Sequence, residues 1–231
     1  MVDKKIIEKV FNQIFFKEIS IKCSKSDLTK ADKEFINNFI NSDEHWRDDA
    51  VDGKENTAYS EYEELQLKHE YRKDEKEAVH DWKCDGFKII NGKIYNTEYY
   101  NLAVKAGLVF EKTLNKKINN LQSAIDNSPR VPFNLVTHRK GHWDKNHKPG
   151  DVIVLKGFAS TSLTGGIQVG STDPYDIDYF VPVDNKAILV TPKQFYGLPE
   201  KELLLGKGTR QYVLSQDDDN KKVSILVLPD K

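Results

Sequence analysis

The stretch Gly157-Phe158-Ala159-Ser160-Thr161-Ser162 decides how the rest of this chain is interpreted. It follows the apolar run at 152–155, a pattern typical of a β-strand that leads into small polar residues. Clusters of Ser and Thr are most often turn residues, so the triplet alone carries little information. Two other apolar runs with polar residues at one end make it informative.

These two runs lie on either side of the triplet in the sequence. Leu135-Val136-Thr137-His138-Arg139-Lys140-Gly141 is an apolar strand that ends in basic residues. Pro199-Glu200-Lys201-Glu202-Leu203-Leu204-Leu205 places two carboxylates at the start of another apolar strand. The order is therefore a strand-borne arginine, then Ser-Thr-Ser, then Glu-x-Glu.

That order resembles the mono-ADP-ribosyltransferases of the arginine–serine–glutamate class, which occur as bacterial toxins and phage enzymes. Glu77-Ala78-Val79-His80-Asp81-Trp82 and the following Gly86-Phe87-Lys88-Ile89-Ile90-Asn91-Gly92 resemble the family's helix-to-loop segment. Residues 70–231 match the family in order and spacing, whereas residues 1–60 match only as helices. The resemblance implies an ADP-ribosyltransferase-like fold, with a β core of two sheets around an NAD cleft.

Composition restricts the other classes of function. The 231 residues carry a net charge of −1, so no basic field indicates a nucleic-acid partner. The N-terminus lacks the features of a signal peptide and no apolar run is long enough for a membrane span, so we expect action in a cytosol. Two cysteines favour free thiols, although one disulfide bridge stays open.

Hydrophobic periodicity divides the chain into a helical half and a β-rich half. Helices are expected over 3–19, from about residue 26, over 60–82, 97–106 and 112–126, with a break over 83–96 that includes an Asn91-Gly92 turn. Strands are expected at 133–137, 151–155, 177–183, 186–191, 202–205, 210–214 and 222–228. The fold class is therefore α+β. We expect one domain over 1–231, with 1–60 as a helical extension or cap and 61–231 as the catalytic core.

The resemblance assigns the NAD site to the three strands. Arg139, with Lys140 and Gly141 beside it, is expected to hold the diphosphate, since a guanidinium can pair two phosphate oxygens. Glu202 is the expected catalytic carboxylate, which stabilises the ribose cation that forms when nicotinamide leaves. Ser160 is expected to hydrogen-bond Glu202 and fix its orientation.

The rest of the central stretch is also expected at the NAD site. Phe158, Ser160, Thr161 and Ser162 are predicted cofactor-binding residues, with Thr161 supporting either NAD or the strand. Side chains two apart on a strand share a face, so Ser160 and Ser162 are expected on one side and Thr161 on the other. The alternative that all three hydroxyl groups satisfy backbone groups stays open.

Acceptor recognition is assigned to the segment before Glu202. Glu200 and Glu202 are expected on one face, with Lys201 pointing away. Glu200 would then bind and deprotonate an acceptor guanidinium, which makes arginine the expected acceptor. Phe195 or Tyr196 would contact the target protein, and the glycine-containing loop over 163–179 would act as a lid.

A cluster of histidines raises the alternative of a metal site. His138, His142, Asp144 and His147 are close in sequence, but their spacing matches no zinc template, so we expect a polar loop and no metal. The predicted function is transfer of ADP-ribose from NAD to a target protein. The alternatives are an NAD glycohydrolase and a non-catalytic binding module, and residues 1–60 could bind a delivery partner.

Overall fold

The structure, a computed structural model, describes residues 21–23, 27–50, 57–164, 175–190 and 201–230. The helix expected over 3–19, most of the lid loop, and Phe195, Tyr196 and Glu200 lie outside the described residues. The described helices are α2 (Lys30–Asn41), α3 (Thr57–Leu67), α4 (Lys73–Asp81), the π-helix η2 (Trp82–Gly86), α5 (Phe87–Tyr95), α6 (Glu98–Lys105) and α7 (Glu111–Asn127).

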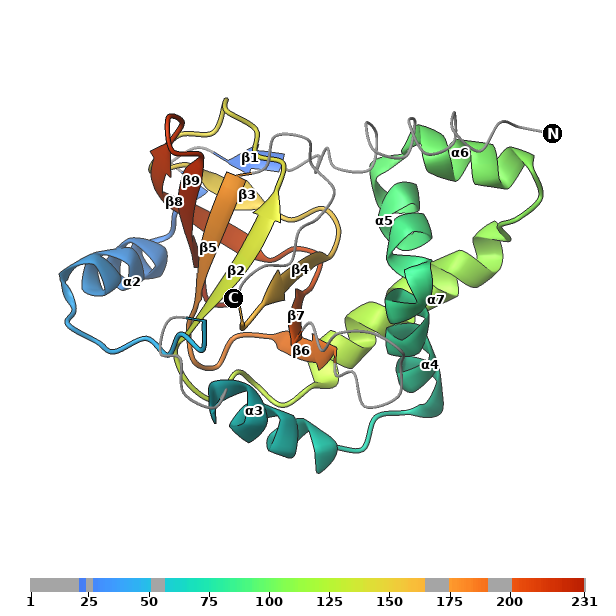
Figure 1. Cartoon of the computed structure of the whole chain (residues 1–231), viewed down its shortest axis with the longest axis horizontal. Helices are drawn as coiled ribbons and strands as arrows, with labels where there is room; N and C mark the ends of the chain where they lie inside the picture. Colours follow the sequence, from blue (N-terminus) through green and yellow to red (C-terminus); the bar gives the residue numbers. More distant parts are fainter. Residues whose placement is uncertain (1–20, 24–26, 51–56, 165–174, 191–200, 231) are drawn as a thin grey trace.

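The described strands confirm the predicted β-rich half. They are β1 (Ile21–Cys23), β2 (Leu135–Gly141), β3 (Val152–Val154), β4 (Ala159–Ser162), β5 (Tyr175–Val181), β6 (Ala187–Val190), β7 (Glu202–Leu205), β8 (Arg210–Asp217) and β9 (Lys222–Val227). The mixed architecture, shown in Figure 1, is the predicted α+β class, with helices α4 to α7 beside the strands.

The arrangement of the strands refines the expectation of two sheets. The described strands hydrogen-bond in one series, β1-β3-β8-β9-β5-β2-β4-β7-β6. A single residue pair, His138–Ser162, joins β2 to β4, whereas β2 and β5 pair along seven residues. The series therefore has two parts, β1 to β2 and β4 to β6, that meet at this one pair.

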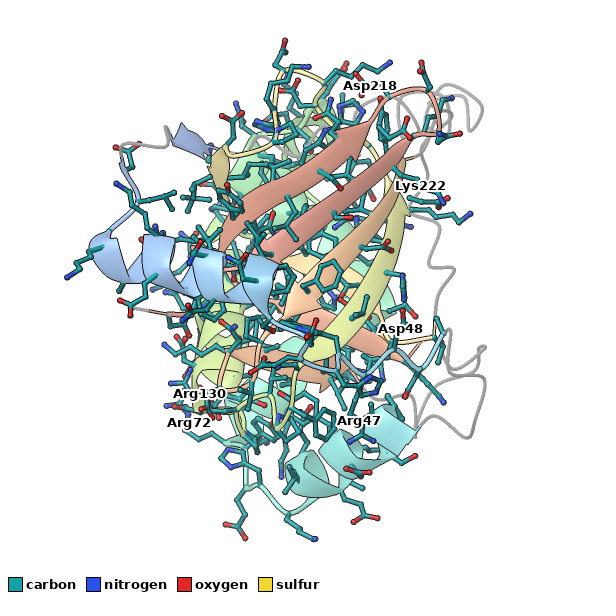
Figure 2. All side chains as sticks on the ribbon, turned by 90° about the vertical axis from the view of Figure 1, so that its left-hand side faces the viewer. Arg47, Asp48, Arg72, Arg130, Asp218 and Lys222 are labelled. Carbon is teal, nitrogen blue, oxygen red and sulfur yellow. The ribbon has the colours of Figure 1, made fainter. Side chains whose placement is uncertain are left out.

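Three groups of buried side chains hold these parts together. The largest lies among the strands and α3, and includes Leu135, Ile177, Leu203 and Tyr62. A second group packs α4 to α7 against the other face of β7 and β6 and against Phe158, which precedes β4. A third packs α2 against β3, β8 and β9, and Figure 2 shows α2 lying across that face of the sheet.

Local sequence explains where α2 and α6 begin. The side chain of Thr29 accepts a hydrogen bond from the Asp32 N–H, and Asp32 accepts from the Thr29 N–H, a capping box that begins α2. The Thr97 side chain caps α6 in the same position. The apolar stripe of α7 is buried as expected, at Leu114, Ile118, Leu121 and Ile125.

Two predictions about the helical half were wrong. The helix expected over 60–82 is two helices, α3 and α4, separated at residues 68–72. The break expected over 83–96 is instead η2 followed by α5, so Asn91-Gly92 lies inside a helix. Gly92 is there because α6 packs closely: a Cβ atom would lie 3.0 Å from Thr97 Oγ1 and 3.2 Å from Tyr100 Cβ.

Candidate active site

The three predicted motifs lie on neighbouring strands and meet in one row. His138 on β2 is opposite Ser162 on β4, and Ser162 is opposite Glu202 on β7. Arg139 is one residue along β2 from this row, and Ser160 is two residues along β4 from it. The fold therefore brings the arginine, Ser-Thr-Ser and glutamate motifs to one place, although they are far apart in the sequence.

Ser160 contacts Glu202 directly, in the geometry expected of a residue that orients a carboxylate. Its hydroxyl group donates to Glu202 Oε1. Trp82 of η2 also donates to Oε1, from its indole Nε1 at 3.0 Å. The sequence places Trp82 in the helix-to-loop segment but gives it no role at the site, because nothing in its spacing shows a partner 120 residues away.

The other residues of the central stretch have separate structural roles. Thr161 is buried on the opposite face, and its hydroxyl group donates to the carbonyl oxygen of Leu203 at 3.1 Å, so it supports the strand. Ser162 is also buried and accepts from the N–H of Thr164 at 3.2 Å. The ring of Phe158 is buried against Trp82, with ring centroids 5.5 Å apart, so it reaches the site through Trp82.

Helix α5 fixes the start of β4. The N–H of Phe158 donates to Asn91 Oδ1 at 3.1 Å, and Asn91 Nδ2 donates to the Phe158 carbonyl oxygen at 3.0 Å. One helical turn later, the Tyr95 hydroxyl group accepts from the N–H of Gly157 at 2.9 Å. A Cβ atom at Gly157 would lie 2.6 Å from Asn91 Oδ1, so the close approach of helix and strand requires glycine.

Arg139 and its neighbours on β2 have different surroundings. The Arg139 side chain is half-buried and passes over Gly141, where a Cβ atom would lie 3.2 Å from Arg139 Nε. Gly141 therefore leaves room for the guanidinium group. Lys140, on the opposite face of the strand, forms an exposed ion pair with Asp176 at 3.1 Å.

His138 links β2 to the connection between α2 and α3. Its ring nitrogen Nδ1 lies 2.8 Å from Asp178 Oδ1, and Nε2 lies 2.9 Å from Asp48 Oδ1. Burial opposes a charge on the ring, but the hydrogen bonds to the two carboxylates outweigh it and raise the pKa of His138 to about 9. The ring is therefore an imidazolium at neutral pH. Figure 2 labels Asp48 beside the sheet.

The ammonium group of Lys83 is close enough to Glu202 to feel its charge. Lys83 follows Trp82 in η2, and burial lowers its pKa while the negative charge of Glu202 opposes that change.

Among the residues that the structure describes, no group of three His, Cys, Asp or Glu side chains could hold a metal ion. Cys84, also in η2, is a free and exposed thiol.

The backbone between the two glutamates differs from the extended strand that alternation predicts. Placing Glu200 and Glu202 on one face requires an extended backbone through Lys201, but Lys201 has φ 39° and β7 begins at Glu202. The ammonium group of Lys201 lies 5.0 Å from the ring centre of Tyr59 on α3. Glu200 itself lies outside the described residues.

Comparisons with known proteins identify the family. Residues 55–228 match the family described as ADP-ribosyltransferase exoenzyme. The chain belongs to this family. It is therefore an NAD-dependent mono-ADP-ribosyltransferase by family, and toxins are among its structural relatives. A comparison with curated proteins finds no match.

Solved structures of ADP-ribosyltransferases share the fold of this family member. A C3-type ADP-ribosyltransferase from Clostridium botulinum has a TM-score of 0.58 and 16% identity, over 81% of this chain and 100% of that chain. A C3-type protein from S. aureus, solved with NAD, has a TM-score of 0.57 and 16% identity, over 82% and 100%. The ADP-ribosylating toxin of a binary enterotoxin from C. perfringens, solved with NADH, has a TM-score of 0.56 and 17% identity, over 74% and 48%.

Proposed function

We propose that this ADP-ribosyltransferase transfers ADP-ribose from NAD to an arginine side chain of a target protein and releases nicotinamide. The observation that carries the proposal is the arrangement of Glu202, whose Oε1 accepts hydrogen bonds from Ser160 and Trp82. A carboxylate fixed in this way needs no reorganisation when a positive charge develops beside it. NAD as the donor is supported by the relatives solved with NAD and NADH.

The site offers a negative charge for the ribose cation and a positive charge for the diphosphate of NAD. The bond between the ribose and nicotinamide breaks, its electron pair leaves with nicotinamide, and the ribose carries the positive charge. Glu202 stabilises that charge, and Arg139, near the same row of residues, provides a cation for the diphosphate. No metal is needed for this division of roles.

Arginine as the acceptor rests on Glu200 and on the resemblance to the family. A guanidinium group must lose a proton before or as it attacks the ribose, and a carboxylate can both bind the group and take the proton. We assign that task to Glu200, and contact with the target protein to Phe195 or Tyr196. The site would act in the cytosol that contains the target.

The described residues before residue 61 support a single domain over 1–231. β1 pairs with β3, and α2 packs on the sheet, where Arg210 forms two hydrogen bonds of 2.8 Å with Asp32. These contacts favour the role of a cap on the core over that of a separate surface for a delivery partner. The described helices include none that is both long and apolar enough to cross a membrane.

The acceptor is tested by treating a cell lysate with the enzyme and labelled NAD, and locating the label by mass spectrometry. We expect a modified arginine. Glu200→Gln should lose this transfer while retaining much of the slow release of nicotinamide into water, because water needs no carboxylate to bind a guanidinium group. Nicotinamide release without any labelled protein would favour the glycohydrolase, and label on another residue type would exclude arginine.

A further inference from the structure

The indole of Trp82 connects the helical half of the molecule to the carboxylate of Glu202. Its Nε1 lies 3.0 Å from Glu202 Oε1, the same oxygen that accepts from Ser160. The Trp82 side chain is 2% exposed. A buried indole N–H must find an acceptor, and here the acceptor is an ionisable carboxylate that reaches it from β7.

A π-helical turn brings Trp82 to this position. Trp82 is the first residue of η2, which lies between α4 and α5. Gly86 ends the turn, and a Cβ atom there would lie 2.1 Å from the carbonyl oxygen of Asp81, so the turn depends on glycine. Such π turns are rare and occur frequently at functional sites, and this one places Trp82 beside Glu202.

Aromatic packing then restricts how the indole can move. Its ring meets Phe158 edge-on, with centroids 5.5 Å apart, and it lies 6.1 Å from the ring of Phe87. Phe158 is in turn held at its backbone by Asn91. The indole N–H therefore reaches Glu202 from a ring that is held in place by its packing.

We propose that Trp82 is a positioning residue for the catalytic carboxylate. Together with Ser160, it fixes Oε1 from two directions, one from the strand β4 and one from the helical half. The orientation of the carboxylate is thus set before NAD binds, which lowers the barrier for bond cleavage more than it strengthens NAD binding. This inference rests on the proposed role of Glu202.

The test is Trp82→Phe, which keeps an aromatic ring against Phe158 and removes the N–H. The matched control is Trp143→Phe, which removes another buried indole N–H, the 3.0 Å bond from Trp143 to Gln216 Oε1. We expect Trp82→Phe to lower kcat for nicotinamide release about tenfold and to change KM for NAD by less than about twofold. Trp143→Phe should change both by less than about twofold.

A double variant tests whether the two donors act through one group. If Trp82 and Ser160 both position Glu202, their effects are not independent, so Trp82→Phe should lower kcat less in a Ser160→Ala protein than in the wild type. Equal effects in both proteins, an unchanged kcat in Trp82→Phe, or a loss confined to KM would each overturn the positioning role.

The contact is also measurable without turnover. The chain has three tryptophans, so nuclear magnetic resonance resolves three indole N–H signals. Trp46→Phe and Trp143→Phe each remove one signal, and the remaining signal is that of Trp82. Glu202→Gln should shift the Trp82 signal and leave the Trp143 signal in place, and this holds even if Trp82→Phe does not fold. An unmoved Trp82 signal would overturn the inference. Wild-type protein that releases no nicotinamide would instead overturn the proposed function.

Discussion

Asn91 holds the backbone of Phe158 from both sides, accepting from its N–H at 3.1 Å and donating to its carbonyl oxygen at 3.0 Å. Asn91 belongs to the helical half and Phe158 immediately precedes β4, so these two hydrogen bonds connect the two halves of the fold. Ser160 follows two residues later. The geometry of the active site therefore depends on a contact that takes no part in the chemistry.

Asn91→Ala should destabilise the protein because it leaves both backbone groups of Phe158 without these bonds. We expect the free energy of unfolding to fall by about 1–3 kcal/mol, the cost of polar groups that lose their partners. Nicotinamide release should fall as well. Asn119→Ala, at an exposed position on α7, is the control and should be nearly neutral. Urea unfolding measures the stability of both variants, and equal unfolding midpoints for Asn91→Ala and Asn119→Ala would contradict the prediction.

The stability of the protein should depend on pH through His138. Its pKa is raised from 6.5 to about 9 in the folded protein, so the bonds to Asp48 and Asp178 stabilise the fold fully below about pH 6.5. That contribution, roughly 1–3 kcal/mol, is lost as pH rises toward 9 and the ring loses its proton.

Unfolding free energies measured between pH 6 and pH 10 would check this dependence. The control is His138→Asn, which can keep a hydrogen bond but cannot gain a charge. Its stability should change less over the same range. A slope that is the same in both proteins would show that another group titrates.

The ion pair between Asp32 and Arg210 should be important for holding α2 on the sheet. Asp32 is buried, and both its oxygens accept from the guanidinium group at 2.8 Å. The hydrogen bonds from Arg210 hold the pKa of Asp32 well below its usual value of 3.8, although burial works against this. The pair therefore stabilises the fold above pH 3.8 and is lost as pH falls below it.

Asp32→Asn should lower the free energy of unfolding by about 3–5 kcal/mol, because it leaves the arginine without a countercharge. The exposed pair Lys73–Glu77 on α4 gives the control, since its residues are 91% and 65% exposed. Glu77→Gln should cost less than about 1 kcal/mol. Thermal unfolding at pH 7 separates the two cases, and similar midpoints would contradict the importance of the buried pair.

Much of this fold could be predicted from the sequence because its strands are short apolar runs bounded by turn residues. The same rules misread Gly86 and the Asn91-Gly92 pair as a break. Glycine and asparagine are turn signals when only local preference is considered. Gly86 lies inside a helix because the π turn brings it against the carbonyl oxygen of Asp81. Asn91 and Gly92 lie inside α5 because tertiary contacts need an amide that binds the backbone of Phe158 and a residue without a side chain beside α6.

The candidate site was predictable to the extent that motif order reflects strand order. Arg139, Ser160 and Glu202 lie on the neighbouring strands β2, β4 and β7, and the bond from Ser160 to Glu202 is present. Trp82 was missed because its contact with Glu202 depends on how helices pack on strands. The position of Glu200 could not be derived from alternation, since the backbone turns at Lys201.

The central claim is that Glu202 is the catalytic carboxylate of an NAD-dependent transferase. The most direct measurement is nicotinamide release from NAD by the wild type, by Glu202→Gln and by the surface control Glu77→Gln. We predict release by the wild type and the control, and a rate lower by on the order of a hundredfold or more in Glu202→Gln, because the substitution keeps the shape but removes the charge. A folded Glu202→Gln protein that releases nicotinamide at the wild-type rate would contradict the account.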